Sequence, residues 1–171
     1  MELNFSKEST KDLVFNQVKE YLKINDLKIE TFDDNRPWGG FFVIDEQEAE
    51  KFIALYFSSF TKEMLSISGR LSPKILIVAP QKRLSWQYHY RRAEIWKLIG
   101  GNAAVVTSDT DEEKDTTKLS IGEIVQLKQG ERHRLIGLDG WGIVAEIWQH
   151  TDATNLSDEE DIVRLQDDFG R

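Results

Sequence analysis

Hydrophobic positions follow a helical spacing in the first part of the chain. Apolar residues recur every three or four positions after Ser9 and Asp12, which resemble a capping box, and predict one helix. Residues 45–60 repeat this spacing and predict a second helix. Between the two helices, residues 27–32 alternate between apolar and polar side chains, which predicts a strand. The apolar stripe of the first helix consists of Leu13, Val14, Val18, Tyr21 and Leu22.

From residue 66 onward the spacing changes to that of β-strands. Short apolar or alternating segments follow one another, separated by Gly, Pro or charged turns, which is typical of an all-β barrel. We therefore expect an all-β barrel at residues 66–171 with a docking C-terminal tail, and a helical and extended N-terminal addition at residues 1–65 packed on it. The predicted strands are residues 65–68, 74–79, 84–89, 94–99, 103–107, 123–128, 133–137 and 142–149.

The composition narrows the class of protein. The chain has 171 residues, 40% of them hydrophobic and 30% charged, which fits one globular domain. A net charge of −8 argues against a nucleic-acid-binding protein. No apolar run approaches the roughly 20 residues of a membrane helix, and the polar N-terminus lacks a signal peptide, so we expect a cytoplasmic protein without a membrane partner. Because the chain has no cysteine, any metal must be held by nitrogen and oxygen atoms.

Three side chains of types that can bind a metal lie close together in the sequence. Gln87 and His89 share one face of a predicted strand, because successive side chains point to opposite faces. A short turn before the next strand would bring the Glu94 carboxylate beside them. His133, in a predicted hairpin about forty residues on, offers a fourth donor. This set suits one divalent ion, with zinc as the first choice and manganese, iron, cobalt or nickel also compatible.

The segments that carry these donors resemble the two sequence motifs of the cupin family. In residues 84–101, Gln87 replaces the leading His of the first motif. In residues 122–137, Lys128 and Gly137 stand where the second motif usually has Pro and Asn. The run QxHxxRAExW is similar to the phosphomannose isomerase (mannose-6-phosphate isomerase) version of the cupin. The resemblance implies a single cupin barrel, also called a double-stranded β-helix or jelly roll, and supports the four metal ligands.

Two further segments resemble the type II isomerase domain. RPWGG at residues 36–40 is similar to its opening motif, and EEDIVRLQDDFGR at residues 159–171 is similar to its closing motif. This domain is often the C-terminal half of an enzyme whose other half is a mannose-1-phosphate guanylyltransferase. The resemblance implies a metal-dependent isomerase that interconverts mannose 6-phosphate and fructose 6-phosphate, moving a proton between C1 and C2 through a cis-enediol.

Several residues are candidates for roles in this reaction. The resemblance points to Arg92, in RRAE, as a catalytic residue. Glu146, on a strong predicted strand, is a candidate base if its side chain faces the barrel interior. Cationic residues flank the predicted ligand strands although the chain is acidic overall, which suits a phosphorylated substrate. The candidate substrate-binding residues are Arg36, Trp38, Lys82, Arg164 and Arg171, with Trp38 as a wall on which the sugar stacks or, alternatively, a core residue.

Other functions fit the same residues. One alternative is a cupin that binds a sugar or sugar phosphate without converting it, and another is a different cupin enzyme such as an epimerase. Ile95 stands where the family commonly has His, so a role of that His in proton transfer would be lost here. The sequence leaves open the metal, the sugar, the base and the oligomeric state, although an apolar N-terminal helix is compatible with a homodimer.

Overall fold

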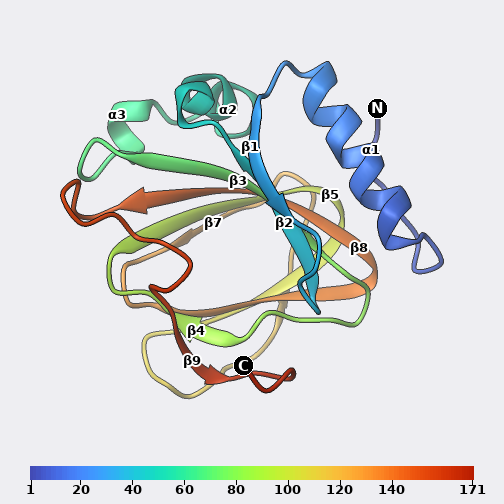
Figure 1. Cartoon of the computed structure of the whole chain (residues 1–171). Helices are drawn as coiled ribbons and strands as arrows, with labels where there is room; N and C mark the ends of the chain where they lie inside the picture. Colours follow the sequence, from blue (N-terminus) through green and yellow to red (C-terminus); the bar gives the residue numbers. More distant parts are fainter.

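Nine strands, each antiparallel to its neighbours, curl into a barrel in the computed structural model, which describes all residues from 1 to 171 (Figure 1). One path through the sheet runs β1-β2-β3-β8-β4-β9, and β5 pairs with β6, β7 and β8. The strands are β1 (Ile29–Asp33), β2 (Gly39–Ile44), β3 (Leu71–Val78), β4 (Trp86–Tyr88), β5 (Arg92–Ser108), β6 (Thr117–Lys118), β7 (Ile124–Leu127), β8 (Arg132–His150) and β9 (Val163–Gln166). The all-β prediction is confirmed.

Alternation along the strands separates two apolar clusters. In β3, Ile75 and Ile77 join a large cluster under the helices, whereas Leu76 and Val78 join a smaller cluster inside the barrel. Lys74 has the same parity as Leu76, so its side chain also faces the interior. The strands β5 and β8 repeat this division, and their registers with each other and with β3 keep the interior positions together.

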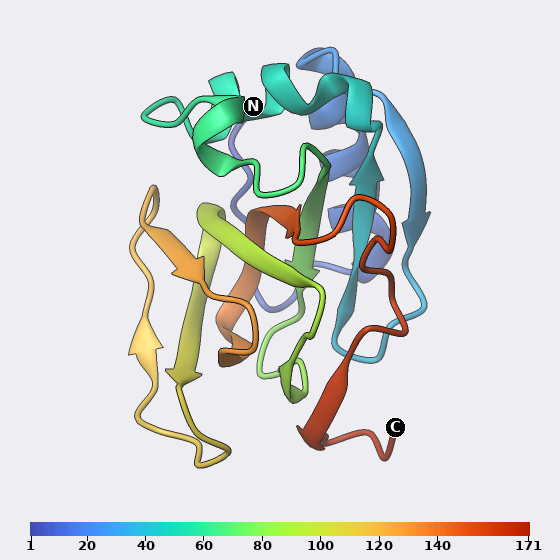
Figure 2. The same cartoon turned by 90° about the vertical axis from the view of Figure 1, so that its left-hand side faces the viewer.

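The helices cover one side of the sheet, as two perpendicular views show (Figures 1 and 2). The first helix, α1 (Lys11–Ile24), is capped by Thr10, whose hydroxyl accepts from the Leu13 amide, one residue later than the predicted cap. Most of its apolar stripe is buried against the sheet of its own chain. The second predicted helix is shorter than expected: a 3-10 turn at Glu46–Glu48 leads into α2 (Ala49–Tyr56), and α3 (Lys62–Leu65) follows.

Two predicted pairs of strands are continuous in the structure. The predicted strands 94–99 and 103–107 form the single strand β5, and 133–137 and 142–149 form β8. The β5 register shifts on both sides of Gly101, whose φ is +65° and whose added Cβ would lie 1.8 Å from the Trp141 carbonyl oxygen. Glycine therefore lets β5 bend without breaking. The predicted strand 65–68 is wrong, because α3 ends at Leu65 and residues 66–68 form an irregular bend.

The N-terminal addition and the C-terminal tail both join the sheet. The strands β1 and β2 extend it beyond β3, so residues 1–65 supply strands as well as helices that pack on the barrel. At the other end, β9 pairs with β4 and brings the tail across the barrel mouth. None of the helices is both long and apolar enough to span a bilayer.

Candidate metal centre

The four predicted ligands meet inside the barrel. Gln87 on β4 lies opposite His133 on β8, His89 follows β4, and Glu94 is the third residue of β5. His89 Nε2 is 3.3 Å from Glu94 Oε1, and His133 Nε2 is 3.4 Å from Glu94 Oε2. Gln87 Nε2 is 3.4 Å from His89 Nε2. All four side chains are buried, so donors distant in sequence form one cluster away from bulk water.

Backbone carbonyls fix the tautomer of both histidines. His89 Nδ1 donates to the Asp161 carbonyl oxygen at 2.6 Å, and His133 Nδ1 donates to the Glu131 carbonyl oxygen at 2.9 Å. Each Nε2 therefore carries a lone pair and points at Glu94. Burial lowers the pKa of His89 to about 3, so that imidazole is neutral near pH 7.

Two of the clustered atoms lack any hydrogen-bond partner. Glu94 Oε2 and His133 Nε2 are buried and unpaired, although a buried acceptor without a donor is costly. Burial alone would raise the pKa of Glu94, but the charge of Arg92 beside it holds that pKa well below its usual range, so Glu94 Oε2 is an acceptor. One ligand atom from each of His89, Glu94 and His133 lies within 4.8 Å of the others. A divalent cation would satisfy these atoms, so the residues fit a metal ion.

Arg92 lies against the ligands. Its Nε donates to Glu94 Oε1 at 2.7 Å, and its Nη2 lies 3.1 Å from the bare Nε2 of His89. The guanidinium carbon is 3.6 Å from the centre of the Trp148 ring. The predicted catalytic Arg92 is therefore at the centre, where its charge faces the same atoms that a metal would use.

A cavity of roughly 550 Å³, its open mouth included, leads to the ligands. Glu146 faces into it and accepts from Trp96 Nε1 at 2.9 Å. Burial, together with the charge of Glu94, raises the pKa of Glu146 to about 8. Lys74 lies opposite Glu146 in the β3–β8 register, and its Nζ is 2.5 Å from Glu159 Oε1 and 3.4 Å from the centre of the Trp148 ring. Burial lowers the pKa of Lys74.

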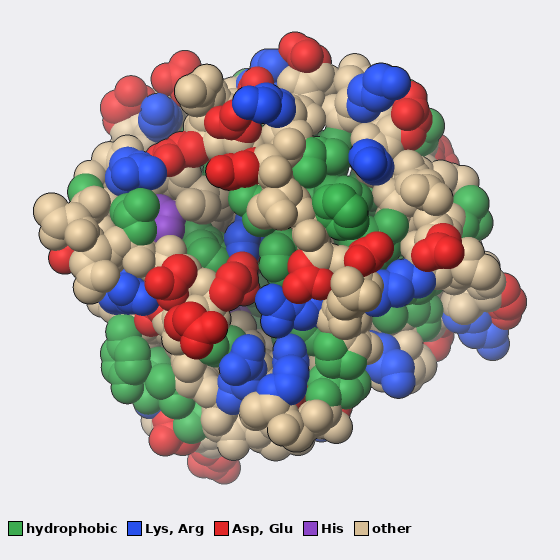
Figure 3. Space-filling model, in the orientation of Figure 1, with side chains coloured by type: hydrophobic (Ala, Val, Ile, Leu, Met, Phe, Trp, Pro, Cys, Tyr) green, Lys and Arg blue, Asp and Glu red, His purple; other side chains and the backbone are tan.

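Cations gather at the mouth of the cavity, where the surface is hollowed (Figure 3). Arg36, Arg164 and Arg171 line this end together with Trp38. Arg164 forms no salt bridge in the structure, and its Nε is buried without a partner. Burial, and then repulsion by Arg171 and Arg36, lowers the pKa of Arg164. An unpaired guanidinium beside two others suits an anionic ligand.

One predicted substrate-binding residue lies elsewhere. Lys82 is exposed in the turn between β3 and β4 and is not among the cavity-lining residues. Its carbonyl oxygen accepts from the Gly137 amide, which holds this turn outside the barrel. The structure therefore gives no support to Lys82 as a phosphate ligand, since nearness to a ligand strand in sequence did not bring its side chain to the site.

Position 95 also lies outside the cavity. Ile95 is fully buried in the cluster under the helices, on the face of β5 opposite Glu94. A side chain there cannot reach a substrate beside the metal ligands. The replacement of the family His by Ile therefore leaves the lining of the cavity unchanged.

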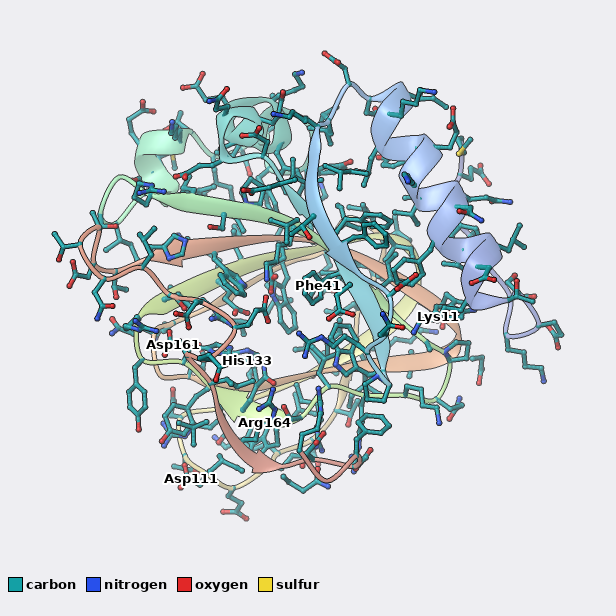
Figure 4. All side chains as sticks on the ribbon, in the orientation of Figure 1. Lys11, Phe41, Asp111, His133, Asp161 and Arg164 are labelled. Carbon is teal, nitrogen blue, oxygen red and sulfur yellow. The ribbon has the colours of Figure 1, made fainter.

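Several residues at the centre were missed by the sequence reasoning. Lys74 could have been found, because it is a charged residue at an interior-facing position of an otherwise apolar strand. Trp148 follows the same rule: it lines the cavity, and its buried Nε1 has no partner. Ser157 and Asp161 had no such signal, since they lie in an irregular segment. Figure 4 shows Asp161 and His133 on the same side of the opening, with Phe41 above and Arg164 below them.

Comparisons with known proteins agree on one family. The family model "Mannose-6-phosphate isomerase C-terminal" matches residues 46–167. The alginate biosynthesis protein AlgA of Pseudomonas aeruginosa is 30% identical over 136 residues, which are 80% of this chain and 22% of AlgA. The xanthan biosynthesis protein XanB of Xanthomonas campestris is 27% identical over 136 residues, 80% of this chain and 23% of XanB. The chain thus spans less than a quarter of the length of these two relatives.

A solved structure supports the architecture. Vicilin from hazelnut, Corylus avellana, superposes with a TM-score of 0.53 at 15% identity, covering 75% of this chain and 34% of vicilin. At this identity the likeness concerns the fold alone. Together with the family match and the observed strand pairing, it shows that the barrel is a cupin.

Proposed function

Because the chain belongs to the mannose-6-phosphate isomerase C-terminal family, we propose that it is a metal-dependent isomerase of mannose 6-phosphate and fructose 6-phosphate. The strongest support is the buried His89–Glu94–His133 cluster, with two unpaired acceptor atoms, at the inner end of a cavity with cations at its mouth.

The centre would hold one divalent ion, with zinc as our first choice. His89, Glu94 and His133 would be ligands through nitrogen and oxygen atoms that zinc accepts. Gln87 would be the fourth ligand through its amide oxygen, which in the structure accepts from the Ser85 hydroxyl at 2.5 Å. When bound, the ion would act as a Lewis acid toward the negative charge that develops on the C1 and C2 oxygens of the sugar. Arg92, which contacts the same ligand atoms, would supply a second positive charge beside these oxygens.

Glu146 is our candidate for the base. Isomerisation removes a proton from C2 of the aldose and returns it to C1, while a second proton passes between the two oxygens. Glu146 lines the cavity, and its raised pKa lets it both take up and return a proton near neutral pH. Lys74, facing it across the β3–β8 pair, would donate a proton to the C1 oxygen as the enediol forms and take up the proton that leaves the C2 oxygen as the ketose forms. The unpaired Trp148 Nε1 offers one more donor for a hydroxyl.

The phosphate would lie at the mouth of the cavity. Five cations line the cavity, namely Arg36, Lys74, Arg92, Arg164 and Arg171, against the three carboxylates of Glu94, Glu146 and Glu159. Arg92 and Lys74 are engaged with Glu94 and Glu159 deep in the cavity. At the mouth, Arg36 and Arg171 pair with Asp33 and Asp167, so Arg164, which has no ionic partner, is our first candidate for the phosphate. Trp38, buried beside them, would form a wall for the sugar ring.

A coupled isomerase assay tests this proposal. Metal-reconstituted protein is assayed with mannose 6-phosphate and fructose 6-phosphate, beside His133→Ala and the matched control Ile95→Val, and the metal content of each is measured. We expect turnover and bound metal in the unaltered chain and in Ile95→Val, and the loss of both in His133→Ala, with activity lower by at least about 10³-fold. Bound metal without turnover on either sugar would favour the sugar-binding alternative.

A further inference from the structure

A short irregular segment of the tail crosses the metal centre from outside the sheet. Residues 157–161 lie between β8 and β9, and two of their polar side chains, Ser157 and Asp161, are each 5% exposed. The Ser157 amide donates to His150 Nδ1 at 3.1 Å, which anchors the start of the segment on the end of β8. Burial of polar side chains outside regular structure is costly unless specific partners hold them.

Asp161 holds the part of the chain that carries His89. Its carbonyl oxygen is the acceptor for His89 Nδ1. Its carboxylate accepts from the Tyr90 amide at Oδ1 and from the Arg91 amide at Oδ2, both at 3.0 Å. One residue therefore fixes the tautomer and ring orientation of a ligand and the backbone of the two residues that follow it.

Ser157 connects the same carboxylate to Arg92. Its hydroxyl donates to Asp161 Oδ2 at 2.6 Å and accepts from Arg92 Nη1 at 2.7 Å. The Asp158 carbonyl oxygen also accepts from Arg92 Nη1, at 3.2 Å. The other side of the Arg92 guanidinium contacts His89 and Glu94, so the segment holds Arg92 against the ligand cluster.

We propose that residues 157–161 are a clamp that positions the metal centre, with Asp161 and Ser157 as its positioning residues. The inference rests on the metal site of the proposed function and adds the tail to it. By placing His89 Nε2 and Arg92, the clamp sets the metal affinity before an ion binds. Because the two events share these contacts, a bound ion in turn stabilises the docked segment, and the amides of Tyr90 and Arg91 exchange more slowly.

Cobalt binding to the full chain measures this effect without any assay of activity. The variants are Asp161→Asn, in which an amide group would face one of the two backbone donors, and the milder Ser157→Ala. Asp152→Asn is the matched control, since Asp152 is exposed in the same connection and its carboxylate accepts from Thr154, two residues on, rather than from a residue of the metal centre. Affinity is obtained by chelator competition, the ligand geometry from the cobalt absorption bands, and hydrogen exchange is compared with and without cobalt.

We expect the two clamp variants to bind cobalt about 10- to 100-fold more weakly than the unaltered chain, with altered bands, and Asp152→Asn to change affinity less than about twofold. Thermal unfolding is recorded separately, so that a loss of stability is not taken for a loss of affinity. Unchanged affinity and bands in folded Asp161→Asn and Ser157→Ala would overturn the clamp while leaving the metal centre. A failure of the unaltered chain to bind any divalent ion would overturn both.

Discussion

Near the ligands, the two faces of the same three strands differ in chemistry. On the interior face of β3, β5 and β8 lie Lys74, Glu94 and Glu146, whereas the adjacent positions on the helix-covered face are Ile75, Ile95 and Ile147. The registers pair interior positions with interior positions and helix-covered positions with helix-covered positions: Lys74 pairs with Glu146, and Ile95 pairs with Ile147. One residue of displacement thus separates the side chains of the site from those that stabilise the fold.

The two faces depend on each other energetically. Buried charges such as those of Arg92 and Glu94 cost free energy even when they are paired, because desolvation opposes their attraction. The cluster under the helices contains 22 buried residues, against 13 in the interior cluster. Apolar burial on the helix-covered face therefore offsets the free-energy cost of the charged groups on the interior face. This division predicts that substitutions of the charged interior residues change the chemistry, while substitutions on the other face change stability alone.

Among substitutions on the two faces, Glu146→Gln should have the largest effect on activity. The substitution keeps the shape of an interior side chain but removes its ability to exchange a proton, so we expect kcat to fall by about 10²- to 10⁴-fold with bound metal retained. In the unaltered protein kcat/KM should rise with pH as the buried carboxyl, whose pKa is raised, deprotonates, and this limb should vanish in the variant. Exposed Glu112→Gln is the control, and a variant with full activity would exclude Glu146 as the base.

The Glu146 carboxyl should also make the stability of the fold depend on pH. Its pKa is raised from 4.5 to about 8 in the folded chain, so between these values the folded state binds a proton that the unfolded state has released. The contribution of this carboxyl to stability should therefore be lost as pH rises from 4.5 to 8, so the unaltered protein should lose stability relative to Glu146→Gln over this window. Urea unfolding of the metal-free proteins at the two ends of this window measures the difference; parallel curves would contradict the raised pKa.

Alternation explains how much of this site the sequence could predict. The strand periodicity predicted the barrel, and the ligand motifs predicted Gln87, His89, Glu94 and His133, which the structure brings together. Parity alone could not orient Glu146, because either face of an unpaired strand can be the inner one; pairing with β3 and β5 decides it. Lys74 is the reverse case. Its alternation with the apolar residues of β3 can be read from the sequence, but the strand that pairs with β3 cannot.

Segments without periodicity were predicted least well. The tail residues 157–161 carry no alternation, so their position over the centre depends on individual hydrogen bonds rather than on a pattern. Lys82 shows the same limit, since a turn residue can lie near a ligand in sequence and outside the cavity in space. Sequence therefore predicts positions within strands better than positions in the connections between them.

Ile147→Ala tests the other face. Ile147 is fully buried between β5 and the helices, and removing its side chain leaves a cavity there. We expect the free energy of unfolding to fall by about 2–5 kcal/mol, measured by urea denaturation of the metal-free protein. Metal affinity and KM of the folded variant should stay within about twofold of the unaltered chain. A loss of metal affinity as large as that of His133→Ala would show that the two faces are not separable.

Arg164→Ala should give the smallest effect and separates binding from chemistry within the interior. Since Arg164 has no ionic partner of its own, its loss should leave stability nearly unchanged. A charge-assisted hydrogen bond to phosphate contributes about 1.5–3 kcal/mol, so KM for the sugar phosphate should rise about 10- to 100-fold while kcat changes little. Lys82→Ala, which removes a cation outside the cavity, is the control and should leave KM unchanged. An unchanged KM in Arg164→Ala would place the phosphate elsewhere, whereas a fall in kcat alone would move Arg164 from the phosphate to the reacting end of the sugar.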